Sequence, residues 1–452
     1  MYVRPSDIQV PLPTADTTYK GIFLKMMFGV MEQQFDSELP LIGKEVPIDD
    51  SPENWNGTYA EFAVDLERLG DAFVSRDDGP IPEGEFTVPK LGRLSEVVVG
   101  VPFHFTEGLA WSQGGGKDVQ LVKPFAYLLK KKLDDLKDLF LRMLYTDSEA
   151  TLGTVTSEAS GVITLTEGQN KQFLNRMKVE NWTVTGAAGS EVWASHKGDV
   201  YIVALGLNAP TVSVSGTRDG VVGAGYSFAF AAGDRLVLKG AAVAGATVAG
   251  SSLNGLDEII DDGTIRTIFE GISRDQWQEW QALRMLAAPT GTGSLTTRLM
   301  HNFIMGQRQV GTGKPSLLLV DPGVMVEGFE LFQPAVEYAP GGTATGGFRK
   351  LMFQSGDIEV ELRRDFAMTR GRMMLLSPET LKLLRKERLG WRPWGYTETG
   401  QPVRSPVQFV SDPKRYRASG SLRMVLNLAC TRCSGNAQLG AITTQDVIYP
   451  RY

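Results

Sequence analysis

Several residues in this sequence have types and spacings that could do chemistry, and the first group lies in the segment 306–320, GQRQVGTGKPSLLLV. Gly313 and Lys314 form the core of a phosphate-binding loop, in which backbone N–H groups surround the phosphates while Lys and a hydroxyl reach the phosphate and its metal. That motif needs a glycine where Arg308 stands and a hydroxyl where Pro315 stands. The order of elements also differs. A phosphate-binding loop follows a strand and precedes a helix, whereas here a predicted helix precedes the loop and the apolar strand LLLV follows it. We therefore interpret the segment as a Gly-Pro turn and expect no nucleotide site.

A second candidate is the C-x-x-C pair Cys430 and Cys433, which are the only cysteines of the chain. This spacing suits a redox pair or half of a zinc site. The surrounding GSLRMVLNLACTRC alternates like a strand, which would point residues three apart to opposite faces, and zinc would need two further ligands. The histidines His104, His196 and His301 are scattered singly. We expect two buried or half-buried thiols in a reducing compartment.

The third candidate is a cluster of carboxylates, Asp257, Glu258, Asp261 and Asp262, which could suggest a site for a hard cation. The cluster lacks the spaced D-x-[DN]-x-[DN]-G loop with its terminal Glu that calcium sites use. None of the three groups forms a convergent catalytic arrangement. We predict no catalytic residues, no cofactor and no metal, and hence no enzyme.

Composition is that of an ordinary globular protein, with 452 residues, 42% of them hydrophobic and 22% charged. No stretch approaches the ~18 consecutive apolar residues of a membrane span. The first residues, MYVRPSDIQVPLPTADTTYK, do not have the basic and then apolar pattern of a secretory signal. We expect a protein that is cytoplasmic where it is made, has no membrane partner and, at a net charge of −6, binds no nucleic acid sequence-specifically.

Charge is distributed unevenly along the chain. Residues 45–85 contain twelve Asp or Glu against two Arg, and residues 349–392 contain eleven Lys or Arg against six acidic residues. Two solvated surfaces would explain this pattern. An alternative is that copies of the chain meet acidic segment to basic segment.

The elements that must position these residues begin with an irregular, acidic arm. Residues 1–85 are rich in Pro, Asp and Glu, with short predicted helical pieces at 22–35 and 59–73. Residues 86–112 contain two β-prone runs about a Gly-containing centre and end in the flexible QGGGKD, which predicts a long hairpin or extended loop. Both segments have too little apolar periodicity to form cores of their own.

The clearest element is a long amphipathic helix over residues 119–145. Its apolar residues recur at spacings of three and four, which places them on one core-facing stripe. Pro124 can lie in the first turn. The stripe comprises Val122, Phe125, Leu129, Leu133, Leu136, Phe140 and Met143.

Composition changes abruptly after this helix. Residues 164–248 are rich in Gly, Ala, Ser, Thr and Val, and strand-length alternations such as TVSVSG and YSFAFA are separated by turns at intervals of about ten residues. This pattern predicts a small, autonomous antiparallel sandwich or barrel inserted into a larger chain. Within it, AAGDRLVLKGA is interpreted as a turn followed by a strand, with no catalytic aspartate.

The order of these elements carries a resemblance. After the β module come GLDEIIDDGT, GISRDQWQEW, a helix at 294–308 and KPSLLLVDPGVMVEGFELF, then GDIEVELRRDFAMTRGRMMLLSPETL with a short predicted helix at its end, and finally GSLRMVLNLACTRC. The chain resembles tailed-bacteriophage major capsid proteins of the Hong Kong 97 type over nearly its whole length except the β module. LLLVDPGVMVEGFE resembles the strand and helix of the axial domain in that family, and SLRMVLNLACT resembles the end of its peripheral domain.

The resemblance implies an α+β capsid fold with a spine helix, peripheral and axial domains and an inserted small β module. It divides the chain into an N-terminal arm at 1–85, an extended loop at 86–118, a peripheral domain with the spine helix at 119–163, the β module at 164–248, the axial domain and return at 249–420, and the closing peripheral strand at 421–452.

The function that the resemblance implies is a major capsid protein. Such a protein self-assembles through pentamers and hexamers into an icosahedral shell that encloses double-stranded DNA without reading its sequence. It is made in the host bacterial cytoplasm and resides in the virion, with a portal and possible scaffolding and decoration proteins as partners. Many relatives begin with a long scaffolding segment, whereas here the arm-like sequence starts near Met1, so we expect a separate scaffolding protein or none.

Residues at subunit contacts are also implied by the resemblance. Some relatives link a Lys of the extended loop to an Asn of a neighbour, and Lys90, Asn427 and Asn436 are the matching residue types here, although no pattern selects one pair. The contact candidates are Lys90, Arg93, Glu96, Arg363, Arg364, Arg370 and Arg372.

Two alternatives from other classes remain at this point. The first is a phage surface or tail-associated binding protein with the β module as its adhesive part. The second is an enzyme with the β module as a substrate domain. Neither explains a long helix flanked by an extended loop on one side and a β insertion on the other.

Overall fold

A computed structural model shows the arrangement of most of the chain. It describes residues 41, 45–51, 55–64, 66, 90–106, 122–147, 151–166, 169–186, 192–206, 209–240, 252–289, 292–311, 313–332, 351–393, 410–412 and 417–444. Two compact units are present. The first comprises 1–43, 98–138 and 385–425, and the second comprises 44–97, 139–384 and 426–452.

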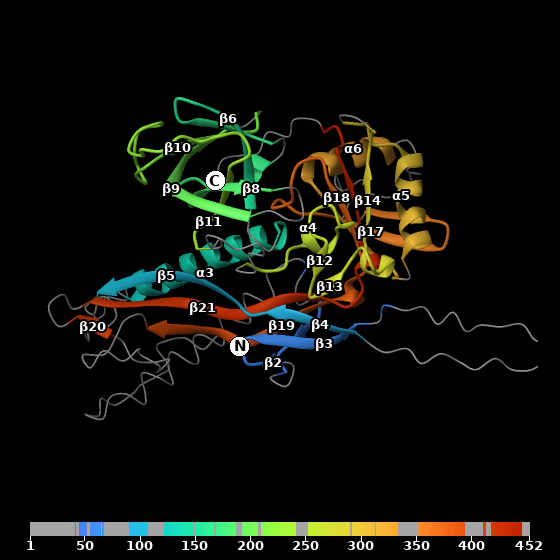
Figure 1. The fold of residues 1–452 in the computed structure, drawn as a ribbon, viewed down its shortest axis with the longest axis horizontal. Helices are drawn as coiled ribbons and strands as arrows, with labels where there is room; N and C mark the ends of the chain where they lie inside the picture. Colours follow the sequence, from blue (N-terminus) through green and yellow to red (C-terminus); the bar gives the residue numbers. More distant parts are fainter. Residues whose placement is uncertain are drawn as a thin grey trace, which may run out of the picture. The chain divides into compact units, whose positions relative to one another are not determined.

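The first unit contains most of the predicted long helix, α3 (Val122–Leu144), which runs along the strands β5 (Val97–Thr106) and β21 (Arg417–Cys430) (Figure 1). Their sheet has the order β1-β19-β21-β20, with β5 also paired to β21. Its other strands are β1 (Ile48–Asp49), β19 (Leu381–Pro393) and β20 (Val410–Asp412). The helix prediction is confirmed to within three residues at its start.

Burial along the second half of α3 follows the predicted stripe, whereas the side chains of Val122, Phe125 and Leu129 lie outside the described residues. Leu133, Leu136 and Phe140 are at most 1% exposed and Met143 is 6% exposed. Lys132 and Asp135, at the flank of this stripe, form a partly exposed ion pair of 2.8 Å. The 3.6-residue period therefore predicted which face of this helix packs against the rest of the protein.

In the second unit, a mixed six-stranded sheet forms one core. Its order is β14-β22-β18-β15-β17-β16. The strands are β14 (Leu283–Leu286), β15 (Leu317–Val320), β16 (Leu351–Ser355), β17 (Ile358–Arg364), β18 (Met373–Leu376) and β22 (Ala437–Gly440). Helix α5 (Thr297–Val310) packs Phe303 and Ile304 into this core. Helix α6 (Pro322–Phe332) follows β15 directly, which confirms the strand and helix predicted for LLLVDPGVMVEGFE.

Two expectations about this region are wrong. The segment after Leu376 forms only a 3-10 turn, η6 (Pro378–Thr380), before β19, so the short helix predicted there is absent from the described chain. The closing segment is not confined to the peripheral sheet, because β22 lies between β14 and β18 in the six-stranded sheet. A four-residue buried strand leaves too short a pattern to predict its partners.

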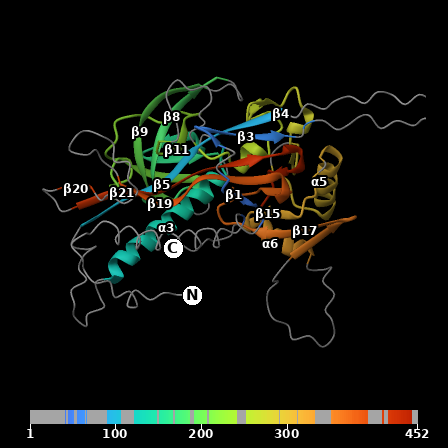
Figure 2. The ribbon, with the colours of Figure 1, turned by 90° about the horizontal axis from the view of Figure 1, so that it is seen from below.

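The inserted β module is a closed barrel with the order β10-β7-β6-β11-β8-β9 (Figure 2). Its strands are β6 (Thr151–Ala159), β7 (Val162–Leu165), β8 (Lys178–Thr185), β9 (Val192–Leu205), β10 (Thr211–Ser215) and β11 (Arg235–Leu238), with the 3-10 turn η3 (Gln169–Gln172) between β7 and β8. The predicted start at residue 164 is therefore wrong, because β6 pairs with both β7 and β11. YSFAFA is not a strand, whereas TVSVS and the turn and strand of GDRLVL are confirmed.

The chain enters and leaves the barrel at neighbouring points. A side chain at Gly255 would collide with the backbone carbonyl of Thr146, so these two backbones are in direct contact. Thr146 precedes β6 and Gly255 follows β11. An insertion with adjacent ends disturbs the parent fold least, and this geometry fits that rule.

The acidic N-terminal segment contributes strands where helix was predicted. β3 (Tyr59–Val64) pairs antiparallel with β4 (Lys90–Ser95), and β2 (Trp55–Asn56) pairs with β3. Of the two alternatives for residues 86–112, the hairpin is wrong, since β4 pairs with β3 while β5 pairs with β21, and the extended loop stays a prediction. The helix predicted at 22–35 lies outside the described residues.

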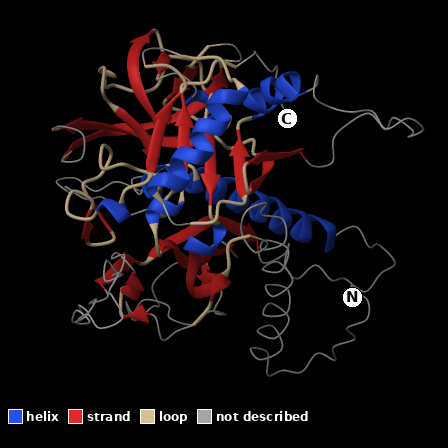
Figure 3. Ribbon diagram, turned by 90° about the vertical axis from the view of Figure 1, so that its right-hand side faces the viewer, coloured by secondary structure: helices blue, strands red, loops and turns tan. Residues whose placement is uncertain are grey.

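Short elements complete the second unit: α4 (Leu256–Ile259), β12 (Ile268–Phe269), β13 (Ile272–Ser273), η4 (Gln278–Trp280) and η7 (Cys433–Gly435). Strands predominate over helices in the described chain (Figure 3). None of the described helices is both long and apolar enough to cross a membrane.

Candidate contact surfaces

The turn at Gly313-Lys314 serves close packing. Helix α5 ends at Val310 and β15 begins at Leu317, as predicted for a turn between a helix and a strand. A Cβ atom at Gly313 would lie 2.7 Å from the Cα of Gly435, so only glycine allows the two backbones to approach. Lys314 is exposed, and its backbone N–H donates to Glu379 at 3.3 Å.

The carboxylate cluster faces arginines. Both oxygens of Asp257 accept from Arg372, at 2.8 and 2.7 Å, and Glu258 pairs with Arg266 at 2.9 Å. A planar guanidinium matches such carboxylates well, and these contacts occupy the oxygens that a cation would need.

Asp261 is the centre of this cluster and is fully buried. Its carboxylate accepts from the guanidinium groups of Arg274, at 3.0 Å, and Arg284, at 3.2 Å. It also accepts from the backbone N–H groups of Ile265, at 3.1 Å, and Arg266, at 2.9 Å. This is a satisfied structural ion pair, and the turn after α4 is built around it.

One group of possible metal ligands occurs on the barrel among the described residues: Glu180, His196 and Asp199. Asp199 already contacts Lys178 at 2.6 Å and Lys239 at 3.2 Å. Two ammonium groups at the same carboxylate oppose a cation by charge, so we assign this group to the barrel surface.

Cys430 and Cys433 are both buried and reduced, as expected. The strand argument about their directions is wrong, because β21 ends at Cys430 and Cys433 opens the 3-10 turn η7. The turn follows β21 directly, so both thiols lie in the same buried part of the fold. Of the histidines, His196 contacts Asp199 at 3.1 Å and His301 contacts Ser355 at 2.9 Å, while the surroundings of His104 lie outside the described side chains.

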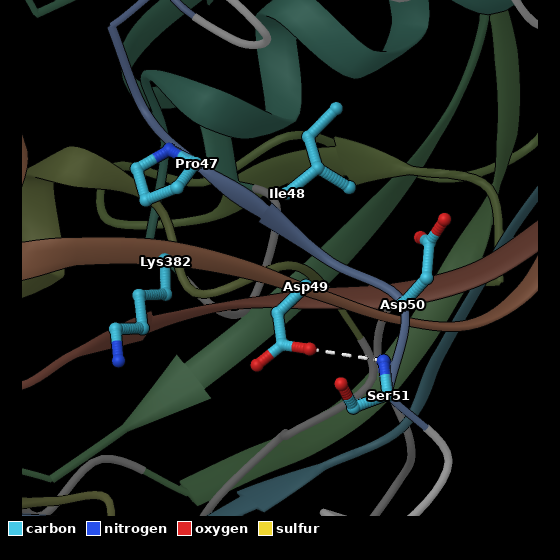
Figure 4. A pocket seen from close by; sticks show the side chains of 6 residues that line it. All are labelled: Pro47, Ile48, Asp49, Asp50, Ser51 and Lys382. Atoms are coloured by element: carbon cyan, nitrogen blue, oxygen red, sulfur yellow. Dashed lines mark hydrogen bonds between the residues drawn. The ribbon is translucent and has the colours of Figure 1, made fainter.

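A hollow of about 630 Å³ is present beside the edge strand β1 (Figure 4). Asp49 and Asp50 line it together with Lys382 of β19, and the Asp49 carboxylate accepts from the backbone N–H of Ser51 at 2.9 Å. Acidic and basic groups share an open rim, without a buried polar group at its base. Such a surface suits contact with another protein better than capture of a small molecule.

The first group of predicted contact residues lies on or beside β4. Lys90 is exposed, with its ammonium 5.5 Å from the ring centre of Trp277. The Arg93 side chain is 67% exposed. It forms an ion pair of 3.0 Å with Glu61 on the neighbouring strand β3. The half-buried Glu96 donates its backbone N–H to Thr58 at 2.9 Å. The structure thus brings Lys90 and Arg93 to one exposed strand.

Three residues of the second predicted group are engaged within the chain. Arg363 donates to Glu45 at 2.9 Å, which joins the basic segment to the acidic segment inside a single copy. Arg370 donates to Thr444 at 2.8 Å, and Arg372 holds Asp257. Their main role here is internal, so part of the charge asymmetry reflects intramolecular pairing.

Arg364 differs from these three because it is exposed beside an exposed aromatic. Its guanidinium lies 5.3 Å from the ring centre of Phe366, whose exposed fraction is 62%. Sequence reasoning missed Phe366, although an aromatic within the charged run RRDF was the available signal. Arginine and aromatic residues are enriched in the centres of protein interfaces.

The loop after β17 carries Phe366 and is held by two hydrogen bonds. Together with Arg364 at the end of β17, we call it the anchored loop. The hydroxyl of Tyr145, which follows α3, donates to Asp365 at 2.8 Å in a buried contact. Burial raises the pKa of Asp365 above its ordinary value. The Gln172 side chain of the barrel donates to the carbonyl of Ala367 at 2.7 Å. The exposed pair therefore projects from a loop held at two points.

The asparagines considered for a covalent link are buried. Asn427 is 2% exposed and donates to the Ser95 carbonyl at 2.8 Å, while Asn436 is 0% exposed and accepts from the Ser377 N–H at 3.0 Å. Neither side chain is accessible to a Lys of a neighbouring copy in this conformation.

Comparisons with known proteins give similarity in structure alone. No family model matches the sequence, and no curated protein matches it. A chain of the cyanophage A-1(L) capsid asymmetric unit superposes with a TM-score of 0.50 at 12% identity, and the match covers 90% of this chain and 93% of that chain.

Lower similarities include a chain of the satellite phage P4 procapsid, with a TM-score of 0.40, 8% identity and coverage of 96% and 99%. The capsid of a native GTA particle gives a TM-score of 0.40, 6% identity and coverage of 89% of each chain. These two scores are too low to support an argument about the fold. The cyanophage match shows that this chain has the fold of a phage capsid protein, so the predicted α+β capsid fold with an inserted small β module is confirmed.

Proposed function

We propose that this chain is the major capsid protein of a tailed bacteriophage and that it self-assembles into an icosahedral shell around double-stranded DNA. The observation that carries the proposal is the structural match to a cyanophage capsid chain over 90% of this chain and 93% of that one. A match of this extent reaches into both compact units, because each contains more residues than the tenth of the chain that the match leaves out. The role is structural, and we propose no catalytic site.

The contact surfaces support the same proposal. Lys90 and Arg93 on β4, and Arg364 with Phe366 on the anchored loop, present exposed cationic and aromatic groups. The hollow beside β1 adds a rim of mixed charge. A shell repeats each contact many times, so modest contacts suffice to hold it together. We propose that these three surfaces meet neighbouring copies in pentamers and hexamers.

Partners and location follow from the proposed role. The shell is assembled in the host bacterial cytoplasm and becomes the virion capsid, with a portal, and with scaffolding or decoration proteins where the phage has them. We propose that the barrel lies on the outer surface of the shell, where the 76% exposed Val221 is available for contact with a neighbour or a decoration protein. The enclosed DNA is held without sequence-specific contacts, consistent with the net charge of −6.

Sedimentation velocity of the purified chain tests the proposal, in parallel with the chain co-expressed with a phage scaffolding protein. We expect discrete species at the size of pentamers and hexamers and a fast-sedimenting closed particle. A single 49.4 kDa species in both preparations, at all concentrations and salt conditions, would overturn the assignment.

A further inference from the structure

The two cysteines have a geometry that the capsid role does not use. Cys430 is the last residue of β21, and Cys433 is the first residue of the turn η7. Both side chains are 0% exposed, and only Thr431 and Arg432 separate them along the chain. They are the only cysteines in the chain, so each has one possible intramolecular partner.

The surroundings of the two thiols are unequal. The Arg274 guanidinium donates to Asp261 at 3.0 Å, and its positive charge lowers the pKa of Cys433. Near Cys430 the contacts are weaker: the Asn436 amide lies 4.0 Å from its sulfur, and its own backbone N–H donates to Glu270 at 3.3 Å. The charge of Arg274 therefore acts on one residue of the pair, and the buried Glu270 carboxyl group accepts from the backbone of the other.

Acidity follows the same asymmetry. Burial raises the pKa of the Cys430 thiol well above its ordinary value. Burial also acts to raise the pKa of Cys433, but the hydrogen bond from Cys430 and the charge of Arg274 outweigh it and bring that pKa below its ordinary value. One nucleophilic thiol beside one protonated thiol is the usual arrangement of a C-x-x-C pair that exchanges with disulfides.

We propose that Cys430 and Cys433 form a reversible two-electron redox pair that a small disulfide converts into an intramolecular disulfide bond. In the first step the Cys433 thiolate attacks one sulfur of the small disulfide, whose S–S bond breaks and releases one thiolate. In the second step Cys430 gives its proton to that thiolate and attacks the Cys433 sulfur, which releases the second thiolate. Two protein thiols are oxidised, and one small disulfide is reduced to two thiols.

Burial controls the rate of this exchange. The turn that carries Cys433 is held by Asn436, which accepts from the Ser377 N–H at 3.0 Å and donates to the Thr380 hydroxyl at 3.1 Å. An oxidant reaches the sulfurs only when this turn opens locally, so oxidation is slow in the folded chain. The chemistry is independent of assembly. Only its timing rests on the proposed function, under which the shell leaves a reducing cytoplasm for an oxidising medium.

The test uses the full chain equilibrated in buffers of reduced and oxidised glutathione at different ratios. Each sample is quenched with N-ethylmaleimide, and its intact mass is measured. We expect one transition from a species with two maleimide adducts to a species with none, two hydrogen masses lighter than the reduced chain, without interchain dimers.

Single variants separate a redox pair from two independent thiols. Cys430→Ser and Cys433→Ser must each lose the oxidised species and form a mixed disulfide with glutathione instead. Cys433 in the first variant should react at least about tenfold faster than Cys430 in the second, because the charge of Arg274 lowers the pKa of Cys433 whereas burial raises that of Cys430. The corresponding Ala variants repeat the measurement if a serine is not tolerated in the buried site, and thermal melts verify that each variant is folded.

A parent chain that carries two maleimide adducts at every glutathione ratio would overturn the proposal. So would a parent chain in which both cysteines form mixed disulfides with glutathione. These masses are read on subunits whether or not they assemble. A failure of the redox pair is therefore distinct from a failure of the capsid assignment.

Discussion

At the scale of single residues, the groups that looked suited to chemistry mostly hold the fold together. Asp261 shows this best, because a fully buried carboxylate joins Arg274 and Arg284 to the backbone of the following turn. The sequence could identify the acidic cluster but not its arginines, which are 13 and 23 residues further along the chain. Their approach depends on the turns around α4 and η4, which carry no regular period.

Asp261→Asn should lower the free energy of unfolding by about 3 to 5 kcal/mol, because it leaves the buried Arg274 without its carboxylate. Urea unfolding followed by circular dichroism measures the change. Asp357→Asn is the matched control, since Asp357 pairs with Arg308 at 2.6 Å in an exposed site. The control should unfold at the midpoint of the parent, and an equal loss in both variants would contradict the structural role of Asp261.

Glu270 predicts a pH dependence. Its backbone has φ of 52° in the tight turn with Gly271, and one of its carboxyl oxygens is buried without a hydrogen-bond partner. Burial raises its pKa well above the ordinary 4.5. The folded chain therefore binds the proton more tightly than the unfolded chain, so the stability from this group is complete below pH 4.5 and is lost as the pH rises through the folded pKa.

Glu270→Gln removes this titration. From pH 5 upward, the free energy of unfolding of the parent should fall relative to the variant, by up to about 1.4 kcal/mol per pH unit. Denaturant melts at a series of pH values measure the two curves. Parallel curves would show that Glu270 has an ordinary pKa in the folded chain.

Phe366 is the residue on which we expect assembly to depend most. Phe366→Ser removes an exposed aromatic that is held beside Arg364, and a hot-spot contact of this kind contributes ~2 kcal/mol or more. We expect at least a tenfold, ~1.4 kcal/mol, rise in the concentration at which shells form, without a change in the melting of the subunit.

The control for Phe366 is Leu286→Ser at the end of β14, where the side chain is 60% exposed and belongs to none of the proposed contact surfaces. Light scattering against protein concentration compares the two variants with the parent. Equal assembly of Phe366→Ser and the parent would remove the anchored loop from the proposed contacts.

At the scale of elements, the predictions succeeded where neighbouring residues determine the structure and failed where a strand depends on a partner that is distant in the sequence. Helices α3 and α5 and strand β15 were predicted because their apolar spacing is set within a few turns of chain. Strand β3 was mistaken for helix, since Tyr59, Phe62, Leu66 and Leu69 also recur at spacings of three and four. Pairing with β4, 26 or more residues away in sequence, overrides that local preference.

The barrel boundary failed for a related reason. Composition changes near residue 164, but the polar, Thr-rich strand β6 before it completes the barrel by pairing with β11, about eighty residues later. A closed barrel has no free edges, so removing one strand exposes two.

Two deletions test this boundary. Replacing residues 148–251 with a short Gly/Ser linker joins the neighbouring ends of the parent fold and should leave the remaining chain folded. Replacing 164–248 leaves β6 without its barrel partners and should give an aggregating or less stable chain. Thermal melts followed by circular dichroism compare them. A longer deletion that does not fold, beside a shorter one that does, would show that residues 151–163 belong to the parent core.

At the scale of the whole molecule, the uneven charge of the sequence has two uses. Some acidic and basic residues meet inside one copy, as Glu45 and Arg363 do at 2.9 Å. Others, such as Lys90 and Arg93 on β4 and Arg364 at the end of β17, remain exposed. Charge counts along the sequence could indicate complementarity but could not separate contacts within a copy from contacts between copies.

Assembly into closed shells is the central claim, and electron microscopy of negatively stained particles tests it most directly. The chain is expressed alone and with a scaffolding protein, and particles are imaged after gradient separation. The account predicts hollow shells of uniform diameter, with fivefold and sixfold clusters of subunits in averaged images. Fields that contain only single subunits or irregular aggregates, from a preparation whose circular dichroism shows folded protein, would contradict it.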